Sequence, residues 1–253
     1  MNARRLLPRL EGHGAAPEGA PPAAPTPARS PPAVAEGRAR RGARSAPAVA
    51  GRLSAGARIA VAIAALGLLS VLALPLWRID LEAPQYPEGL GMEIRVNTIV
   101  GVKPNDLNNI NNLNHYIGMK VITPEDFPEL RVMPWLVAGL SVMGLLVAVS
   151  GRRRLLYAWV VLLALFALAG LADFYRWSYD YGHNLDHERA IIKVPGMTYQ
   201  PPLIGSKQLL NFRAHSWPGS GGWTAIAAGT LASLVAAREL VRARRARRVA
   251  EVT

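Results

Sequence analysis

Residues 154–175, RLLYAWVVLLALFALAGLADFY, decide the fold class of this chain. The run carries charge only near its two ends, at Arg154 and Asp173. A helix needs about 20 predominantly apolar residues to cross the hydrocarbon core of a bilayer, and this run has that length. Arg152–Arg154 lie at its start, and an aromatic cluster typical of a membrane interface follows Asp173. The run therefore predicts a membrane-spanning helix.

Three further apolar blocks of similar length lie elsewhere in the chain. Together the blocks predict an all-α membrane protein with four transmembrane helices, at 57–77, 132–150, 154–175 and 222–241. The segments left outside the membrane, 78–131 and 176–221, are expected to form a small mixed cap. In the first of them, Glu93–Val102 is rich in β-branched residues and predicts a strand. Little regular structure is expected in the second.

The net charge of +12 is unevenly distributed. Lys and Arg gather in residues 1–56, in Arg152–Arg154 and between Arg238 and Arg248. With four spans these regions lie on one side of the membrane, which by the positive-inside rule is the cytoplasm, together with both termini. The basic tail, 242–253, could be a nucleic-acid arm or a contact with anionic lipid. Its place beside a span favours lipid, so the bilayer is the expected partner and no nucleic acid is.

Two compositional features narrow the possibilities further. Residues 1–56 are rich in Ala, Pro, Arg and Gly, and such a segment cannot bury enough apolar surface to fold, so a disordered tail is predicted. The chain has no cysteine, which excludes disulfides, cysteine-bound iron–sulfur clusters and covalently attached haem.

The stretch Asn105–Lys120, NDLNNINNLNHYIGMK, is the least ordinary part of the chain. Its apolar residues recur at helical spacing and predict an amphipathic helix that begins near Asn105. The face opposite them is polar and consists of Asn108, Asn112, His115 and Met119. If Gly118 ends the helix, however, Met119 lies beyond it and leaves that face.

Methionine and histidine are the candidate metal ligands. The outer segments hold Met92, Met119 and Met197, each directly after a glycine, and four of the five His residues. Thioether and imidazole ligands without thiolate suit Cu(I). The sequence thus predicts a shared extracytoplasmic Cu(I) site formed by Met92, His115, Met119, His183 and Met197. The alternative is that these Met residues fill irregular gaps, that each His is a satisfied polar group, and that the Asn face docks a protein partner.

Span four places small residues at four-residue steps: Ala225, Gly229, Ser233 and Ala237. Such spacing allows close helix contact, either within the chain's own bundle or in a homodimer. The chain shows no GxSxG, Walker or HExxH motif and no His inside a span, so neither an enzyme nor a haem-binding bundle is expected.

Three strings are distinctive: APQYPEGLGM at 83–92, NNLNHYIGM at 111–119 and KVPGMTYQPPLIGS at 193–206. Through them the chain resembles a poorly characterised family of bacterial multi-span membrane proteins, found in gene clusters for nitrous oxide reductase and its copper-site maturation. The resemblance covers about residues 77–221. It implies an accessory role in the bacterial cytoplasmic (inner) membrane, near a periplasmic copper chaperone or copper enzyme.

Two functions follow as expectations. In the first, the protein binds or hands on Cu(I) during maturation of a periplasmic copper enzyme such as nitrous oxide reductase. In the second, it is a metal-free membrane scaffold that docks a periplasmic or membrane partner.

Overall fold

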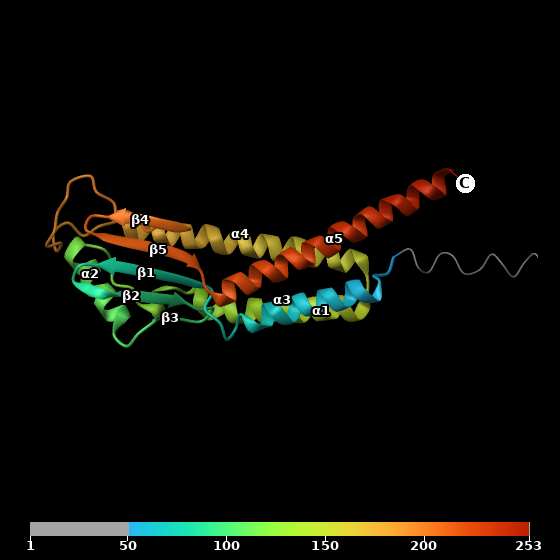
Figure 1. The fold of residues 1–253 in the computed structure, drawn as a ribbon, viewed down its shortest axis with the longest axis horizontal. Helices are drawn as coiled ribbons and strands as arrows, with labels where there is room; N and C mark the ends of the chain where they lie inside the picture. Colours follow the sequence, from blue (N-terminus) through green and yellow to red (C-terminus); the bar gives the residue numbers. More distant parts are fainter. Residues whose placement is uncertain (1–50, 253) are drawn as a thin grey trace, which may run out of the picture. The chain divides into compact units, whose positions relative to one another are not determined.

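The structure is a computed structural model that describes residues 51–252. Residues 1–50, which hold most of the predicted disordered tail, lie outside the described part of the chain. Within residues 51–252, a five-stranded antiparallel sheet lies at one end of the long helices (Figure 1).

Three helices are long and apolar enough to cross a membrane: α3 (Glu129–Ser150), α4 (Arg153–His183) and α5 (Ser220–Val252). A fourth helix, α1 (Ala55–Ser70), is apolar but has only 16 residues, fewer than the roughly 20 that a span requires. The predicted architecture of four spans is therefore wrong for the described residues. The third predicted span is longer than expected, because α4 continues through the aromatic cluster to His183.

The predicted first span, 57–77, is divided between a helix and the sheet. Helix α1 ends at Ser70, and the chain turns before Leu76, whose backbone N–H donates to the Ile94 carbonyl at 2.9 Å. The first strand then begins at Trp77. Apolar content alone does not distinguish the end of a helix from the start of a half-buried strand, so one long span was expected.

The sheet overturns the all-α prediction. Its strands are β1 (Trp77–Ala83), β2 (Tyr86–Ile94), β3 (Ile99–Gly101), β4 (Gly205–Leu209) and β5 (Phe212–Pro218), in the order β3-β2-β1-β5-β4. The pairing of β1 with β5 joins the two predicted outer segments into one sheet. The predicted strand Glu93–Val102 is instead parts of β2 and β3 around a turn, in which Arg95 N–H donates to the Thr98 carbonyl at 2.8 Å.

The Asn-rich stretch forms helix α2 (Asp106–Ile117), as its spacing predicts. Its start differs from the expectation: Asn105 is left-handed and makes no capping bond. The buried Asp106 carboxylate instead accepts hydrogen bonds from the backbone N–H groups of Gly91 (3.0 Å) and Lys103 (3.1 Å). Helix α2 is thereby attached to β2. A short 3-10 turn, Pro124–Asp126, leads into α3.

The long helices pack closely around Trp159 of α4. This side chain is fully buried, and its indole N–H donates to the Leu140 carbonyl of α3 at 2.8 Å. Gly144 of α3 lies against the indole ring, where a Cβ would clash. Helix α1 completes this core, with Val61 and Ala65 among its buried residues.

Candidate functional site

A cavity of about 920 Å³ lies between the helices and the sheet. Helices α4 and α5 supply one part of its wall, and the apolar face of the sheet, α1, α2, the start of α3 and the segment before β4 supply the rest. Because side chains alternate along a strand, β1 directs Ile79 and Leu81 to the cavity and Arg78 and Asp80 to the other face. The fold therefore forms a large, mainly apolar cavity next to the helices that are long and apolar enough to cross a membrane.

Small residues line the part of the cavity between α4 and α5 together with larger ones such as Leu163, Phe166 and Leu234. The four positions predicted to mediate close helix contact, Ala225, Gly229, Ser233 and Ala237, all lie in its wall. Gly170 of α4 lies there too. A Cβ added at Gly170 or at Gly229 would meet no atom within 4 Å. Within this chain, then, these two glycines border open space rather than a tightly packed helix.

The sheet end of the cavity is aromatic. The rings of Trp77 and Phe174 have centroids 5.3 Å apart. Phe127 lies 4.6 Å from Trp177 and 5.9 Å from Tyr181, again between ring centroids. All five side chains belong to the cavity wall. The Trp77–Phe174 and Phe127–Trp177 pairs are tilted, at 56° and 49°, and the Phe127–Tyr181 pair is stacked at 22°, so these rings pack on one another as aromatic clusters usually do.

Three cavity-lining residues each carry a buried polar atom without a hydrogen-bond partner in residues 51–252. These atoms are Trp177 Nε1, Tyr199 Oη and Glu129 Oε2. The other carboxylate oxygen of Glu129 pairs with Arg176 at 2.9 Å. Each of these three atoms has under 1 Å² of accessible surface, so it does not face the open space of the cavity, and buried polar atoms of the same kind also occur outside this wall, at Arg95, Tyr157 and His215.

Tyr199 is held in the wall by a close backbone contact. Its N–H donates to the Gly182 carbonyl of α4 at 2.9 Å, and a Cβ on Gly182 would clash with the backbone of Gln200. Lys207 Nζ also donates to the Gln200 carbonyl at 3.1 Å. Burial raises the pKa of the Tyr199 phenol above its ordinary value, so the group remains a hydrogen-bond donor at neutral pH.

The structure brings two of the five predicted copper ligands to this cavity. Met92 lies on β2 opposite Ile79, and its side chain contributes to the wall. Met119 follows Gly118, which ends α2 in a left-handed conformation, and it too lines the cavity. Helix termination thus separates Met119 from His115, which lies on the exposed face of α2 with Asn108 and Asn112.

The remaining predicted ligands do not line the cavity. His183 stacks on Tyr179 with ring centroids 3.9 Å apart, and its Nδ1 lies 3.0 Å from the Tyr179 carbonyl oxygen. Met197 is half-buried in the segment between α4 and β4. The described residues contain no group of three His, Asp or Glu side chains arranged to hold a metal ion.

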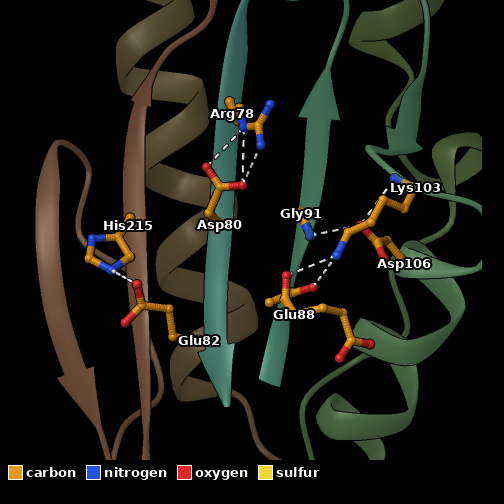
Figure 2. A network of polar contacts seen from close by, with 9 residues as sticks. Arg78, Asp80, Glu82, Glu88, Gly91, Lys103, Asp106 and His215 are labelled. Atoms are coloured by element: carbon orange, nitrogen blue, oxygen red, sulfur yellow. Dashed lines mark hydrogen bonds and ion pairs between the residues drawn. The ribbon is translucent and has the colours of Figure 1, made fainter. Parts of the chain in front are cut away.

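The opposite face of the sheet is polar (Figure 2). Arg78 donates to both carboxylate oxygens of Asp80, at 2.9–3.0 Å. His215 lies 3.4 Å from Glu82 through Nε2 and 2.6 Å from the Ser206 hydroxyl through Nδ1. A serine hydrolase uses the opposite ring nitrogens for the acid and the hydroxyl. We therefore interpret this row as cross-strand pairing.

Sequence reasoning missed Trp177 and Tyr199. Trp177 belongs to the aromatic cluster after Asp173, which the sequence analysis assigned to the membrane interface. Tyr199 lies in the second outer segment, where little regular structure was expected. A scan against protein-family models and a search of curated proteins found no match to this chain. The resemblance to the copper-maturation family remains a prediction.

Proposed function

We propose that this is a membrane protein that binds a lipophilic small molecule in the cavity between its sheet and its helices. The observation that carries the proposal is the chamber itself, about 920 Å³ in volume and lined mainly by apolar side chains. Ligand sites are usually concave and apolar with a few polar groups, and this wall has that character. Its contact with α4 and α5 would let a ligand enter sideways from the bilayer.

The distribution of arginine residues supports an orientation of the protein in the membrane. Arg152–Arg154 and Arg238–Arg248 lie at the end of the helices away from the sheet (Figure 1). By the positive-inside rule that end is cytoplasmic, and the sheet and cavity face the outside of a bacterial cytoplasmic membrane.

Cysteine labelling tests the orientation. The chain has no cysteine, so Ser206→Cys in β4 and Glu251→Cys near the end of α5 each give one exposed thiol. A membrane-impermeant maleimide added to intact spheroplasts should label the first variant and label the second only after lysis. The reverse pattern would contradict the orientation.

Native mass spectrometry of the gently solubilised protein tests the proposed function. We expect one lipophilic molecule per chain to survive purification, to be released by organic solvent, and to be replaced when an apolar probe such as dodecylbenzene is added. Protein that is ligand-free and takes up no probe would overturn the proposal.

Cu(I) handling is the second candidate, and one observation favours it. Met92 on β2, Met119 just after α2 and Met133 on α3 line the same cavity. Three thioethers are a ligand set suited to Cu(I). This copper site differs from the one that the sequence predicts, because Met133 takes the place of the histidine ligands.

An anaerobic Cu(I) titration against a chromophoric chelator tests this candidate. It predicts tight binding that Met92→Leu and Met119→Leu abolish. Met143→Leu is the matched control, because Met143 packs among the helices and does not line the cavity. The variants His115→Ala and His183→Ala should bind copper normally. Weak binding, or equal binding by all variants, would exclude a cavity copper site.

A further inference from the structure

We propose that the cavity opens sideways through a slot between the middle of α4 and the middle of α5, and that its ligand passes through this slot from the bilayer. The inference rests on the proposed function: it locates the route to the same site and names the side chains that control it. Two observations carry it, namely which lining residues are exposed and where α4 and α5 are held.

The exposed residues of the cavity wall gather on α4 and α5. The lining residues of α1, α2 and α3 are all buried or half-buried. Those that both line the cavity and are exposed include Ala164, Ala167 and Leu171 on α4, and Ile226, Thr230, Ser233, Leu234 and Ala237 on α5. Steps of mainly three or four residues place each set on one side of its helix. A residue that borders the cavity and is exposed as well stands at its mouth, so the mouth lies between these two helices.

The slot is closed at both ends. At the end away from the sheet, Glu239 of α5 pairs with Arg153 of α4 at 2.8 Å. At the sheet end, the ring of Phe174 packs against Trp77, with centroids 5.3 Å apart. Between these contacts, none of residues 160–177 of α4 is buried. Helix α4 is thus held at its two ends and forms a wall one helix thick in between.

The slot lies at the level of the hydrocarbon layer. On α5 it extends from Ile226 to Ala237, a helical rise of about 17 Å, which is shorter than the roughly 30 Å of a bilayer's apolar core. Residues 226–237 of α5 and 160–172 of α4 include no charged side chain. The rim therefore meets acyl chains, and a molecule dissolved in the bilayer can reach the cavity without passing through water.

The water-facing side of the wall offers a competing route. Within residues 51–252, one lining residue there is exposed: Ile204, in the segment before β4. That segment is held in place, because Ser216 Oγ donates to the Leu203 carbonyl and Lys207 Nζ to the Gln200 carbonyl, both at 3.1 Å. A single exposed position beside bonded neighbours does not form a slot, so we place the route between α4 and α5.

The test follows the exchange of a bound probe. The full-length protein is reconstituted in lipid nanodiscs and loaded with dodecylbenzene. Deuterated dodecylbenzene is then added to the bilayer, and native mass spectrometry measures the rate at which it replaces the first probe. Leu234→Ala widens the rim and should speed replacement about 3-fold, whereas Thr230→Trp narrows the rim and should slow replacement about 10-fold.

Two exposed positions provide matched controls. Leu168→Ala on α4 and Ala227→Trp on α5 make the same kinds of change outside the cavity wall, and both should exchange at the wild-type rate. Leu234→Ala adds no volume to the cavity. Faster exchange in this variant therefore identifies the rim even where the tryptophan of Thr230→Trp also occupies part of the cavity.

The outcomes separate the two proposals. If Leu234→Ala and Thr230→Trp exchange at the rate of their controls, the slot is not the route, while the proposed site stands. If Ile204→Trp slows exchange more than Thr230→Trp does, the ligand enters from the water side. If the wild type binds no probe, the proposed function fails as well.

Discussion

A single missing Cβ at Gly182 sets the position of Tyr199. The backbone of Gln200 lies so close to Gly182 that any side chain there would push residues 199–200 away from α4. We expect Gly182→Ala to lower the free energy of unfolding by about 1–3 kcal/mol through overpacking and to weaken ligand binding. Thermal unfolding and native mass spectrometry measure the two effects.

Gly139→Ala is the control for this substitution. Gly139 is an exposed glycine of α3 with open space around it, and Ala favours a helix. Neither the free energy of unfolding nor the ligand affinity should therefore fall in Gly139→Ala. Equal behaviour of the two variants would show that the close contact at Gly182 does not position Tyr199.

The same tyrosine predicts a pH dependence. Burial raises the pKa of Tyr199 above the ordinary value of 10.0, so the buried phenol favours the folded state while it is protonated. This contribution is complete below pH 10.0 and is lost as the pH rises through the higher folded-state pKa. Between pH 6 and 9, ligand affinity should not change through this group. Above that range, the melting temperature of the wild type should fall more than that of Tyr199→Phe, and parallel curves would contradict the prediction.

At the scale of elements, Asp106 attaches α2 to the sheet. Its buried carboxylate accepts from Gly91 and Lys103, so Asp106→Ala leaves two backbone donors without their acceptor. We expect a loss of about 1–3 kcal/mol and faster hydrogen exchange in α2. Asn112→Ala changes an exposed residue of the same helix and should leave exchange nearly unchanged. Similar exchange in both variants would show that the Asp106 contacts do not stabilise α2.

Elements that depend on a local sequence pattern could be predicted, and elements that depend on pairing between distant segments could not. Helical spacing in Asn105–Lys120 and apolar length in 154–175 act over a few turns, and both stretches form helices. The sheet depends on the pairing of β1 with β5, whose partners lie between 131 positions apart, for Glu82 with Arg213, and 141 positions apart, for Trp77 with Pro218. No local sequence pattern identifies the strand with which a distant strand pairs. Strands such as Gly205–Leu209 are also mostly exposed and polar, so they carry little apolar alternation.

The candidate site was predicted only in part for a related reason. Met92 and Met119 were singled out by residue type, and both reach the cavity. His115 and Met119 were expected on one helix face, but Gly118 ends α2 between them. Tyr199 reaches the cavity wall through the contact of the 184–204 segment with Gly182 of α4, which the sequence of neither segment indicates.

At the scale of the whole molecule, Glu239 holds α4 and α5 together at the end away from the sheet. Its fully buried carboxylate lies 2.8 Å from Arg153 Nε and 3.1 Å from Arg242 Nη1. Glu239→Ala removes the shared partner of two arginines whose side chains are 19% and 43% exposed and can be hydrated, so the loss should be about 1–3 kcal/mol. Glu251→Ala, at an exposed position of the same helix, is the control. Equal melting temperatures would show that this contact contributes nothing.

If a lipophilic ligand occupies the space between α4 and α5, a side chain that fills this space should displace it. Gly229→Leu adds a side chain where the cavity is open, and Gly139→Leu adds the same side chain at an open position of α3 outside the cavity wall. Native mass spectrometry of both variants beside the wild type measures bound ligand per chain. We predict that Gly229→Leu loses most of its ligand and that Gly139→Leu retains it. Full retention by Gly229→Leu would contradict the account.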